Sequence, residues 1–227
     1  LSGHPEFNGN QLDNSYVNNF YIPLSEFGYE IAKTAGRDDL LFAAQKNSYH
    51  PVVNDLNRIE KDESIQPIDL GKAATDYLGT NDRLYDAMFS IWLIALVARA
   101  FDAGCKFDNC LVLQGAEGLR KSPFFKALAG NDDWVVDTWQ QNEQKLYMCI
   151  NQCWIYELAE LDHMTSKSHQ GALKAMFSSA TDNYPPPYAR GVGKFPRPSV
   201  FAATCNRIDF LSDPSADHRR YWIIPLK

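Results

Sequence analysis

The stretch LVLQGAEGLRKSPFFKALAG, residues 111–130, runs from an apolar segment through a glycine-containing loop into a helix-forming segment. A strand, a loop and a helix in this order form the usual setting of a phosphate-binding loop. The loop follows the pattern G-x-x-x-x-G-K-[ST] from Gly115 to Ser122, except that Arg120 stands where glycine normally precedes the lysine. Three interpretations follow: a working nucleotide site, a decayed one, or a chance resemblance in an ordinary strand–turn–helix connection.

The chemistry of such a loop identifies the candidate residues. Backbone N–H groups wrap the phosphates, a lysine reaches the terminal phosphates and a hydroxyl binds Mg²⁺. Lys121 and Ser122 provide the last two groups, and Pro123 falls in the first helical turn, where its missing N–H costs nothing. Arg120 is compatible with the loop if its side chain points outward. The candidate nucleotide-binding residues are Gly115, Ala116, Glu117, Gly118, Leu119, Arg120, Lys121 and Ser122.

The composition is that of a folded protein with a reduced interior. Of the 227 residues, 45% are hydrophobic and 13% aromatic, which suffices for a sizeable core and excludes a disordered chain. The net charge of −6 means that a nucleic-acid surface would have to be a local basic patch. The five cysteines, an odd number in mostly apolar surroundings, indicate buried thiols in a reducing compartment. No second Cys/His pair accompanies Cys149 and Cys153, which argues against zinc.

The sequence shows no signal for export or for a membrane. The first residues, LSGHPEFNGN, contain no basic or apolar run, so we expect no signal peptide. The longest apolar stretch, Ala87–Phe101, is shorter than a bilayer requires. We therefore expect a cytoplasmic protein without membrane association. Because the chain starts without methionine and ends just after YWIIPL, we also expect a fragment excised from a longer polypeptide.

The spacing of apolar residues along the sequence changes near residue 105. Before it, apolar positions recur at helical spacing, so residues 1–104 are predicted to form a mainly helical N-terminal section, its first roughly 20 residues loose. After it, short apolar runs rich in strand-forming residues alternate with helices, so residues 105–227 are predicted to form an α/β core. The helices expected in the first section are Pro23–Ala35, Asp38–Gln45, Pro51–Ile59, Ala73–Leu78 and Asn81–Ala103.

Two segments end an apolar run with polar side chains. In CWIYELAELD, residues 153–162, a strand would bring Glu157 and Glu160 to the edge of a sheet beside Mg²⁺; the alternative is an exposed acidic start of a helix. In SVFAATCNRIDFL, residues 199–211, a strand from Ser199 to Thr204 places Asn206 at its carboxyl end, where open α/β sheets bind ligands. Asn206 would there orient the attacking water or sense the terminal phosphate; otherwise it is a turn residue.

Basic residues gather in two places near the end of the chain. Arg219 and Arg220 precede an apolar strand, and arginine from a neighbouring subunit can stabilise the transition-state charge of phosphoryl transfer. A surface ion pair with a nearby aspartate is the alternative. The segment DNYPPPYARGVGKFPRPS, residues 182–199, suits a hairpin that presents cations and aromatics to a nucleic-acid backbone, or a proline-rich loop with a few charges. The candidate DNA-binding residues are Arg190, Lys194 and Arg197.

The order of these motifs carries more information than each motif alone. A phosphate loop, an acidic strand, a basic hairpin, a strand ending in asparagine and paired arginines follow one another as in superfamily 3 helicases. More closely, the chain resembles the virulence-associated protein E family over residues 47–224. The segments that carry this resemblance are YHPVVNDL, WLIALVARAF, CKFDNCLVLQG, FFKALAG, ELAELD, LKAMFSSATDNYPPPYARGV and FAATCNRIDFL…RRYW.

The resemblance implies an α/β P-loop NTPase core of the AAA+-like, superfamily 3 helicase type, found on phages and mobile elements and often joined to a primase domain. It implies that Lys121 contacts ATP and that Ser122 contacts Mg²⁺. Its other implied roles are an acidic pair, one member of which ligates the metal (Glu157, Glu160), a sensor (Asn206), a finger acting across a ring (Arg219 or Arg220) and a DNA hairpin (Arg190 to Arg197). Arg120 and Pro123 depart from the family's glycine and second hydroxyl, which bears on catalytic rate more than on fold.

The favoured function is ATP hydrolysis coupled to translocation on single-stranded or fork DNA during replication of a phage or mobile element. The chain would assemble as a hexameric ring and be monomeric when isolated. The retention of Lys121, Ser122, both carboxylates, Asn206 and the arginines favours a functional loop over a decayed one. The alternative is a DNA-binding or assembly module with the same fold and an inactive nucleotide site. A metabolic P-loop kinase would need a small-molecule acceptor pocket, which the sequence does not reveal.

Overall fold

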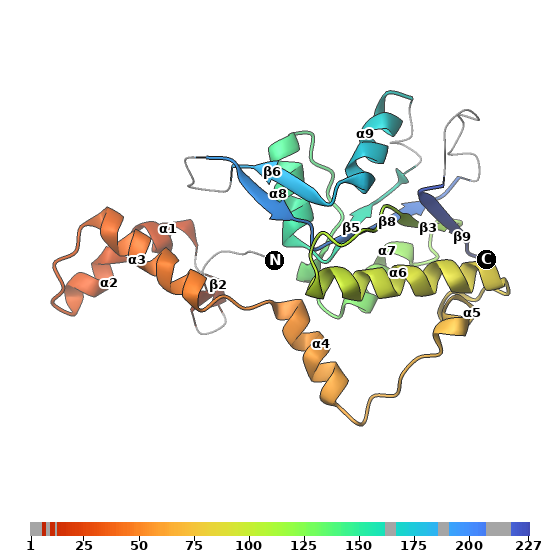
Figure 1. The fold of residues 1–227 in the computed structure, drawn as a ribbon, viewed down its shortest axis with the longest axis horizontal. Coiled ribbons are helices and arrows are strands. Elements are labelled where there is room, and N and C mark those ends of the chain that lie inside the picture. Colours follow the sequence, from red (N-terminus) through yellow and green to blue (C-terminus); the bar gives the residue numbers. More distant parts are fainter. Residues whose placement is uncertain (1–5, 8–9, 12, 162–166, 186–190, 208–218) are drawn as a thin grey trace. The chain divides into compact units, whose positions relative to one another are not determined.

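The computed structural model describes residues 6–7, 10–11, 13–161, 167–185, 191–207 and 219–227 (Figure 1). The chain forms two compact units, one of residues 2–54 and one of residues 55–227. The division falls inside helix α4 (Pro51–Lys61). The larger unit thus begins well before residue 105, the predicted boundary between the helical section and the α/β core. The reason is that a long helix from residues 1–104 packs against the sheet formed by residues 105–227.

The smaller unit is mostly helical. Asp13 caps its first helix by accepting a hydrogen bond from the backbone N–H of Tyr16 at 2.6 Å, so the region expected to be loose includes an ordered helix. The expected helix Pro23–Ala35 is wrong, because the chain turns at Gly28, whose φ of +86° suits a helix end. The elements are β1 (Glu6–Phe7), β2 (Asn10–Gln11), α1 (Asn14–Asn18), α2 (Tyr21–Glu26) and α3 (Lys33–Lys46), which includes the expected helix Asp38–Gln45.

The larger unit is built on a sheet of five parallel strands in the order β4-β5-β8-β3-β9. Its strands are continuous apolar runs rather than alternating ones, as expected where helices cover both faces of a sheet. Every residue of β5 and β8 is buried. The predicted mixed α/β class is confirmed. The strands are β3 (Cys110–Gln114), β4 (Val135–Val136), β5 (Ile155–Leu158), β8 (Val200–Cys205) and β9 (Tyr221–Pro225).

Helices lie on both faces of the sheet (Figure 1). On one face, the ring of Phe177 in α9 lies 5.0 Å from that of Phe201 in β8 and 5.5 Å from that of Tyr221 in β9. On the other face, Trp92 of α6 lies 5.9 Å from Phe125 of α7, ring centroid to ring centroid. These helices are α6 (Arg83–Phe101), α7 (Lys121–Ala129), α8 (Glu143–Gln152) and α9 (Lys167–Ser178), and the shorter ones are η1 (Leu70–Lys72), α5 (Ala73–Leu78) and η2 (Asp132–Trp134).

Helix α6 is tied to the sheet by polar contacts as well as apolar ones. The indole of Trp92 donates to the Phe201 carbonyl at 2.8 Å, and Arg99 donates to the Ser199 carbonyl at 2.6 Å. Among the helices in the described ranges, α6 alone is long and apolar enough to cross a membrane by length and composition, against the expectation that its apolar run is too short. Core helices of soluble proteins pass the same test, and the buried Trp92 and Arg99 show that one face of α6 packs into this unit.

The predicted hairpin is present. Strands β6 (Thr181–Tyr184) and β7 (Gly193–Pro196) pair antiparallel, with Thr181 opposite Pro196 and Tyr184 opposite Gly193. The ring of Tyr184 stacks on that of Phe195 with their centroids 4.4 Å apart. The hairpin follows helix α9 directly and leads into β8, so it connects one face of the sheet to a central strand.

Candidate functional site

The loop between β3 and α7 has glycine at two positions. A side chain at Gly115 would place its Cβ 2.7 Å from Leu119 Cδ1 and 3.1 Å from the Leu226 carbonyl oxygen, so the Leu119 side chain would have to move and the carbonyl to shift slightly. Gly118 has a φ of +88°, which residues with a side chain rarely adopt. Gly118 is thus the position where the path of the loop requires glycine, and Gly115 is a tightly packed position.

Arg120 adopts a backbone conformation that normally belongs to glycine. It precedes the first turn of α7 with φ 54° and ψ 35°, where the Cβ of an L residue costs about 1–2 kcal/mol. Its side chain is exposed, as the sequence requires if arginine is to fit this loop. Arg120 thus occupies a left-handed backbone position that glycine adopts more readily.

Lys121 turns its ammonium group back into the loop. The residue is 8% exposed, and its Nζ donates to the carbonyl oxygens of Gly115 at 2.7 Å and Ala116 at 2.8 Å. A third hydrogen bond, 2.9 Å long, reaches the side-chain oxygen of Asn206. Asn206 follows β8 directly, so its predicted place at the carboxyl end of a strand is confirmed. The structure brings Lys121 and Asn206 together and satisfies all three N–H donors of the ammonium group.

Ser122 lies against Glu157, which β5 holds in the interior. The serine Oγ donates to Glu157 Oε1 at 2.5 Å, and Thr204 Oγ1 lies 3.4 Å from the same oxygen. Glu157 is only 1% exposed, and its second oxygen, Oε2, has no hydrogen-bond partner. Burial raises the pKa of the Glu157 carboxyl, the hydrogen bond from Ser122 lowers it, and the charge of Asp137 raises it further. A cation beside Oε2 would remove the cost of this buried, half-satisfied carboxylate.

These oxygens fit Mg²⁺ better than a metal held by protein groups alone. Within the described ranges, no three His, Cys, Asp or Glu side chains gather where they could hold a metal ion. Mg²⁺ is usually bound by one or two protein oxygens, with waters and substrate phosphates completing an octahedron. The Ser122 hydroxyl and the Glu157 carboxylate are such a pair, next to a loop whose backbone would face phosphates.

Glu160 lies at the same end of the sheet in a different setting. It is exposed, has a φ of 52°, and its backbone N–H donates to Thr204 Oγ1 at 3.3 Å. The turn after β5 therefore separates the two predicted carboxylates: Glu157 points into the interior beside Ser122, and Glu160 lies at the surface.

Sequence reasoning missed an acid–base pair at this edge. Asp137 directly follows β4, and since Val136 pairs with Tyr156, Asp137 lies level with Glu157 on the neighbouring strand. Lys126, one turn after Ser122 on α7, binds Asp137 with 3.2 Å between Nζ and Oδ2. The hydrogen bond and charge of Asp137 raise the pKa of Lys126. The available signal was a third apolar run ending in a polar side chain, VVD, of the same kind as the run before Glu157.

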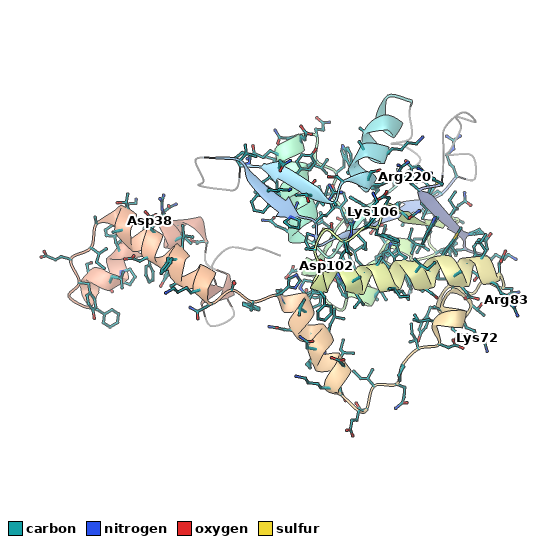
Figure 2. All side chains as sticks on the ribbon, viewed as in Figure 1. Asp38, Lys72, Arg83, Asp102, Lys106 and Arg220 are labelled. Atoms are coloured by element: carbon teal, nitrogen blue, oxygen red, sulfur yellow. The ribbon has the colours of Figure 1, made fainter. Side chains whose placement is uncertain are left out.

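The paired arginines lie at the opposite edge of the sheet. The backbone carbonyl of Arg220 accepts from Cys110 N–H at the first residue of β3, whereas the loop begins after the last residue of that strand. Arg220, labelled in Figure 2, lies where α9 meets the start of β9 and donates its Nε to Ser178 Oγ at 3.1 Å. Arg219 is more exposed than Arg220. Neither arginine is therefore brought to the loop of its own chain.

The three predicted DNA-binding residues have different outcomes. Lys194 is exposed on β7, and Arg190 lies outside the described residues. The assignment of Arg197 is wrong: its side chain is fully buried, forms an ion pair with Asp182 and donates to the Met176 carbonyl. A guanidinium buried in this way is held by its own chain and does not reach a DNA backbone.

Together the fold and the site define an α/β protein in which a glycine loop, a buried carboxylate and an asparagine meet at the carboxyl edge of a parallel sheet. The Virulence-associated protein E-like domain family matches residues 56–227, and the chain belongs to this family. No curated protein gives a significant match. Two solved apo structures of the NrS-1 C-terminal region, both in the A form, are similar in fold, with TM-scores of 0.52 and 0.53 at 14% identity. The similarity covers 74% of this chain but 39% and 40% of theirs.

Proposed function

We propose that this chain is a P-loop ATPase of the AAA+-like, superfamily 3 helicase type that drives translocation on DNA in the replication of a phage or mobile element. The observation that carries the proposal is the pair of side-chain contacts from the start of α7 to two neighbouring strands: Lys121 to Asn206 and Ser122 to Glu157. Four side chains from three segments thereby surround one point at the carboxyl edge of the sheet, where open α/β sheets bind ligands.

The nucleotide would lie across the loop with its phosphates at the start of α7. Backbone N–H groups of residues 115–122 and the positive end of the helix would hold the phosphates. Lys121 would exchange its internal acceptors for phosphate oxygens, which frees Asn206 to contact the terminal phosphate or the attacking water. Ser122 and Glu157 would hold Mg²⁺, which when bound neutralises charge that develops on the phosphate oxygens.

The remaining predicted residues take supporting roles in this proposal. Glu160, exposed at the same edge, would orient water at the surface of the site. Arg219 or Arg220 would complete the site of an adjacent copy in a ring of six, since both lie at the far edge of the sheet from their own loop. Lys194, with Arg190, would contact the backbone of single-stranded DNA. The protein would act in the cytoplasm, beside or joined to a primase domain.

The test is DNA-stimulated ATPase activity. Wild type should hydrolyse ATP with Mg²⁺ faster when single-stranded DNA is present, and Lys121→Ala should abolish nucleotide binding or turnover. Lys145→Ala, an exposed lysine on α8, is a matched control and should leave both unchanged. Unchanged hydrolysis in Lys121→Ala would end the ATPase proposal.

A second candidate function is a DNA-binding or assembly module with an inactive nucleotide site. Two observations favour it: Lys121 is fully satisfied without a ligand, and Arg120 replaces the loop glycine. This candidate predicts DNA binding that neither ATP nor Mg²⁺ alters and that Lys121→Ala leaves intact. Titration of labelled single-stranded DNA with and without ATP separates the two functions.

A further inference from the structure

Two pairs of side chains lie one above the other between α7 and the sheet. Ser122 and Lys126 are one helical turn apart, so they share a face of α7. They meet Glu157 and Asp137, which lie level on neighbouring strands: the serine donates to Glu157 at 2.5 Å and the lysine binds Asp137 at 3.2 Å. The strand register and the helix repeat thus align a polar pair and an ion pair in one row.

The two pairs differ in burial. Glu157 is 1% exposed, and its Oε2 is buried without a partner. In the outer pair, 38% of the Lys126 side chain and 42% of the Asp137 side chain are exposed. A depression of about 540 Å³ beside this part of α7 is lined by Ser122 and Lys126 together with Gly130 and Asp132. Lys126, held by Asp137, therefore borders the same depression as Ser122.

We propose that the Lys126–Asp137 ion pair is a positioning element of the nucleotide site, which sets the balance between its affinity for a divalent cation and its affinity for polyphosphate. The inference rests on the proposed function, because it assumes that Ser122 and Glu157 receive a cation and that the loop receives phosphates. As a pair, Lys126 and Asp137 add no net charge beside Glu157. Both charges act on Glu157, so removing either one leaves a full charge of the other sign close to that carboxylate.

This arrangement predicts effects of opposite sign on the two ligands. With Lys126→Met, the unpaired Asp137 carboxylate attracts a cation to the neighbourhood of Glu157 and repels polyphosphate. With Asp137→Asn, the unpaired Lys126 ammonium does the reverse. Both charges border solvent, so screening limits the effects, and we expect changes of about two- to fivefold at low ionic strength that nearly vanish at high salt.

The experiment measures the two ligands separately and needs no turnover. Binding of Mn²⁺, as a spectroscopic substitute for Mg²⁺, is followed by electron paramagnetic resonance on the nucleotide-free protein. Binding of ATP is followed by calorimetry in EDTA. Lys126→Met should tighten Mn²⁺ binding and weaken ATP binding, Asp137→Asn should do the opposite, and the double variant should return both close to wild type.

Each outcome decides something. A variant that misfolds would weaken the binding of both ligands together, and thermal melting of the double variant, which removes both charges of the ion pair at once, controls for that. If wild type binds both ligands and every variant binds each of them with the wild-type affinity, the inference is overturned and the proposed function stands. Failure of wild type to bind either ligand would overturn the proposed function and this inference with it.

Discussion

The two edges of the sheet differ in whether their charged side chains find all their partners within the chain. At the amino edge, where strands begin, arginines are satisfied by their own chain. Arg99 donates to three backbone carbonyls, Arg197 pairs with buried Asp182, and Arg220 donates to Ser178. Such contacts fix loops and the hairpin to the core, and each guanidinium has its acceptors within hydrogen-bonding distance.

At the carboxyl edge the polar groups are not all satisfied. Glu157 Oε2 is the one carboxylate oxygen among the buried side-chain atoms without a partner in the described part of the chain. Lys121 is satisfied only by loop carbonyls and by Asn206, all acceptors that phosphate oxygens can replace. Among the charged side chains, those at the amino edge have their acceptors within the chain, whereas Glu157 at the carboxyl edge has capacity for a ligand. The predictions below test this difference from the largest expected effect to the smallest.

The largest effect is expected where the two edges meet in an assembly. If Arg219 or Arg220 acts on the nucleotide of an adjacent copy, the double variant Arg219→Ala/Arg220→Ala should lose about 10³-fold or more in turnover, as Lys121→Ala does. Each variant is inactive alone, but a mixture should regain part of the activity because some interfaces join an intact loop to intact arginines. ATPase assays across mixing ratios measure this recovery.

The control for the mixing experiment is co-assembly. Labelled subunits should exchange, as seen by energy transfer, before activity is scored. Mixtures that exchange but stay inactive would leave the arginine pair as a structural element of the amino edge, in line with the contact of Arg220 to Ser178.

Substitution of the buried carboxylate should lower turnover without lowering the free energy of unfolding. Glu157→Gln keeps the shape but removes the charge that would face Mg²⁺, so turnover should fall about 100- to 1000-fold. Because the charge is buried and half-satisfied, the free energy of unfolding should stay equal or rise by up to about 1 kcal/mol. Glu160→Gln, at the exposed position, should change stability by less than about 0.5 kcal/mol. Denaturant titration beside kinetic assays provides both numbers, and a clear stability loss in Glu157→Gln would make Glu157 structural.

Two basic residues near the hairpin should differ in what their substitution changes: one should change stability and the other DNA binding. Arg197→Ala should lower the free energy of unfolding by about 3–5 kcal/mol, since it leaves the Asp182 carboxylate buried and unpaired. Lys194→Ala should leave stability within about 0.5 kcal/mol but lower the salt slope of single-stranded DNA binding by about 1. Unfolding curves and binding titrations at several salt concentrations check the two. An unaltered slope in Lys194→Ala would move DNA binding to another surface.

Much of this fold could be predicted from local sequence. The apolar runs at 110–114 and 200–205 became adjacent parallel strands, and the segment after Lys121 became α7. Helix α5 begins and ends at the predicted residues, with Gly79 in a left-handed conformation after it. These elements are set by runs, caps and glycines within a few residues, which is the range that sequence patterns report.

What could not be predicted depends on which strands become neighbours. Asp137 was missed because β4, which it follows, has only two residues, and because only the pairing of β4 with β5 shows that Asp137 lies level with Glu157. The burial of Arg197 depends on Asp182, its partner on the opposite strand of the hairpin region. The contact of Lys121 with Asn206 likewise follows from β8 lying next to β3. Local patterns name the groups, whereas sheet order decides which groups meet.

The smallest expected effect concerns Arg120, the departure from the loop pattern. Arg120→Gly removes a Cβ from a left-handed position, and Arg120→Ala keeps it, while both lose the guanidinium. The glycine variant should therefore be the more stable of the two by up to about 1 kcal/mol, reduced by the greater freedom of glycine in the unfolded chain. Their affinities for ATP should agree within about twofold, because strain in a loop that keeps its conformation should not change the proposed phosphate contacts. Calorimetry and thermal melting of the two variants measure this. If both variants lose affinity for ATP equally relative to wild type, Arg120 contacts phosphate. If only the glycine variant gains affinity for ATP, Arg120 is a tolerated replacement that strains the loop at the carboxyl edge.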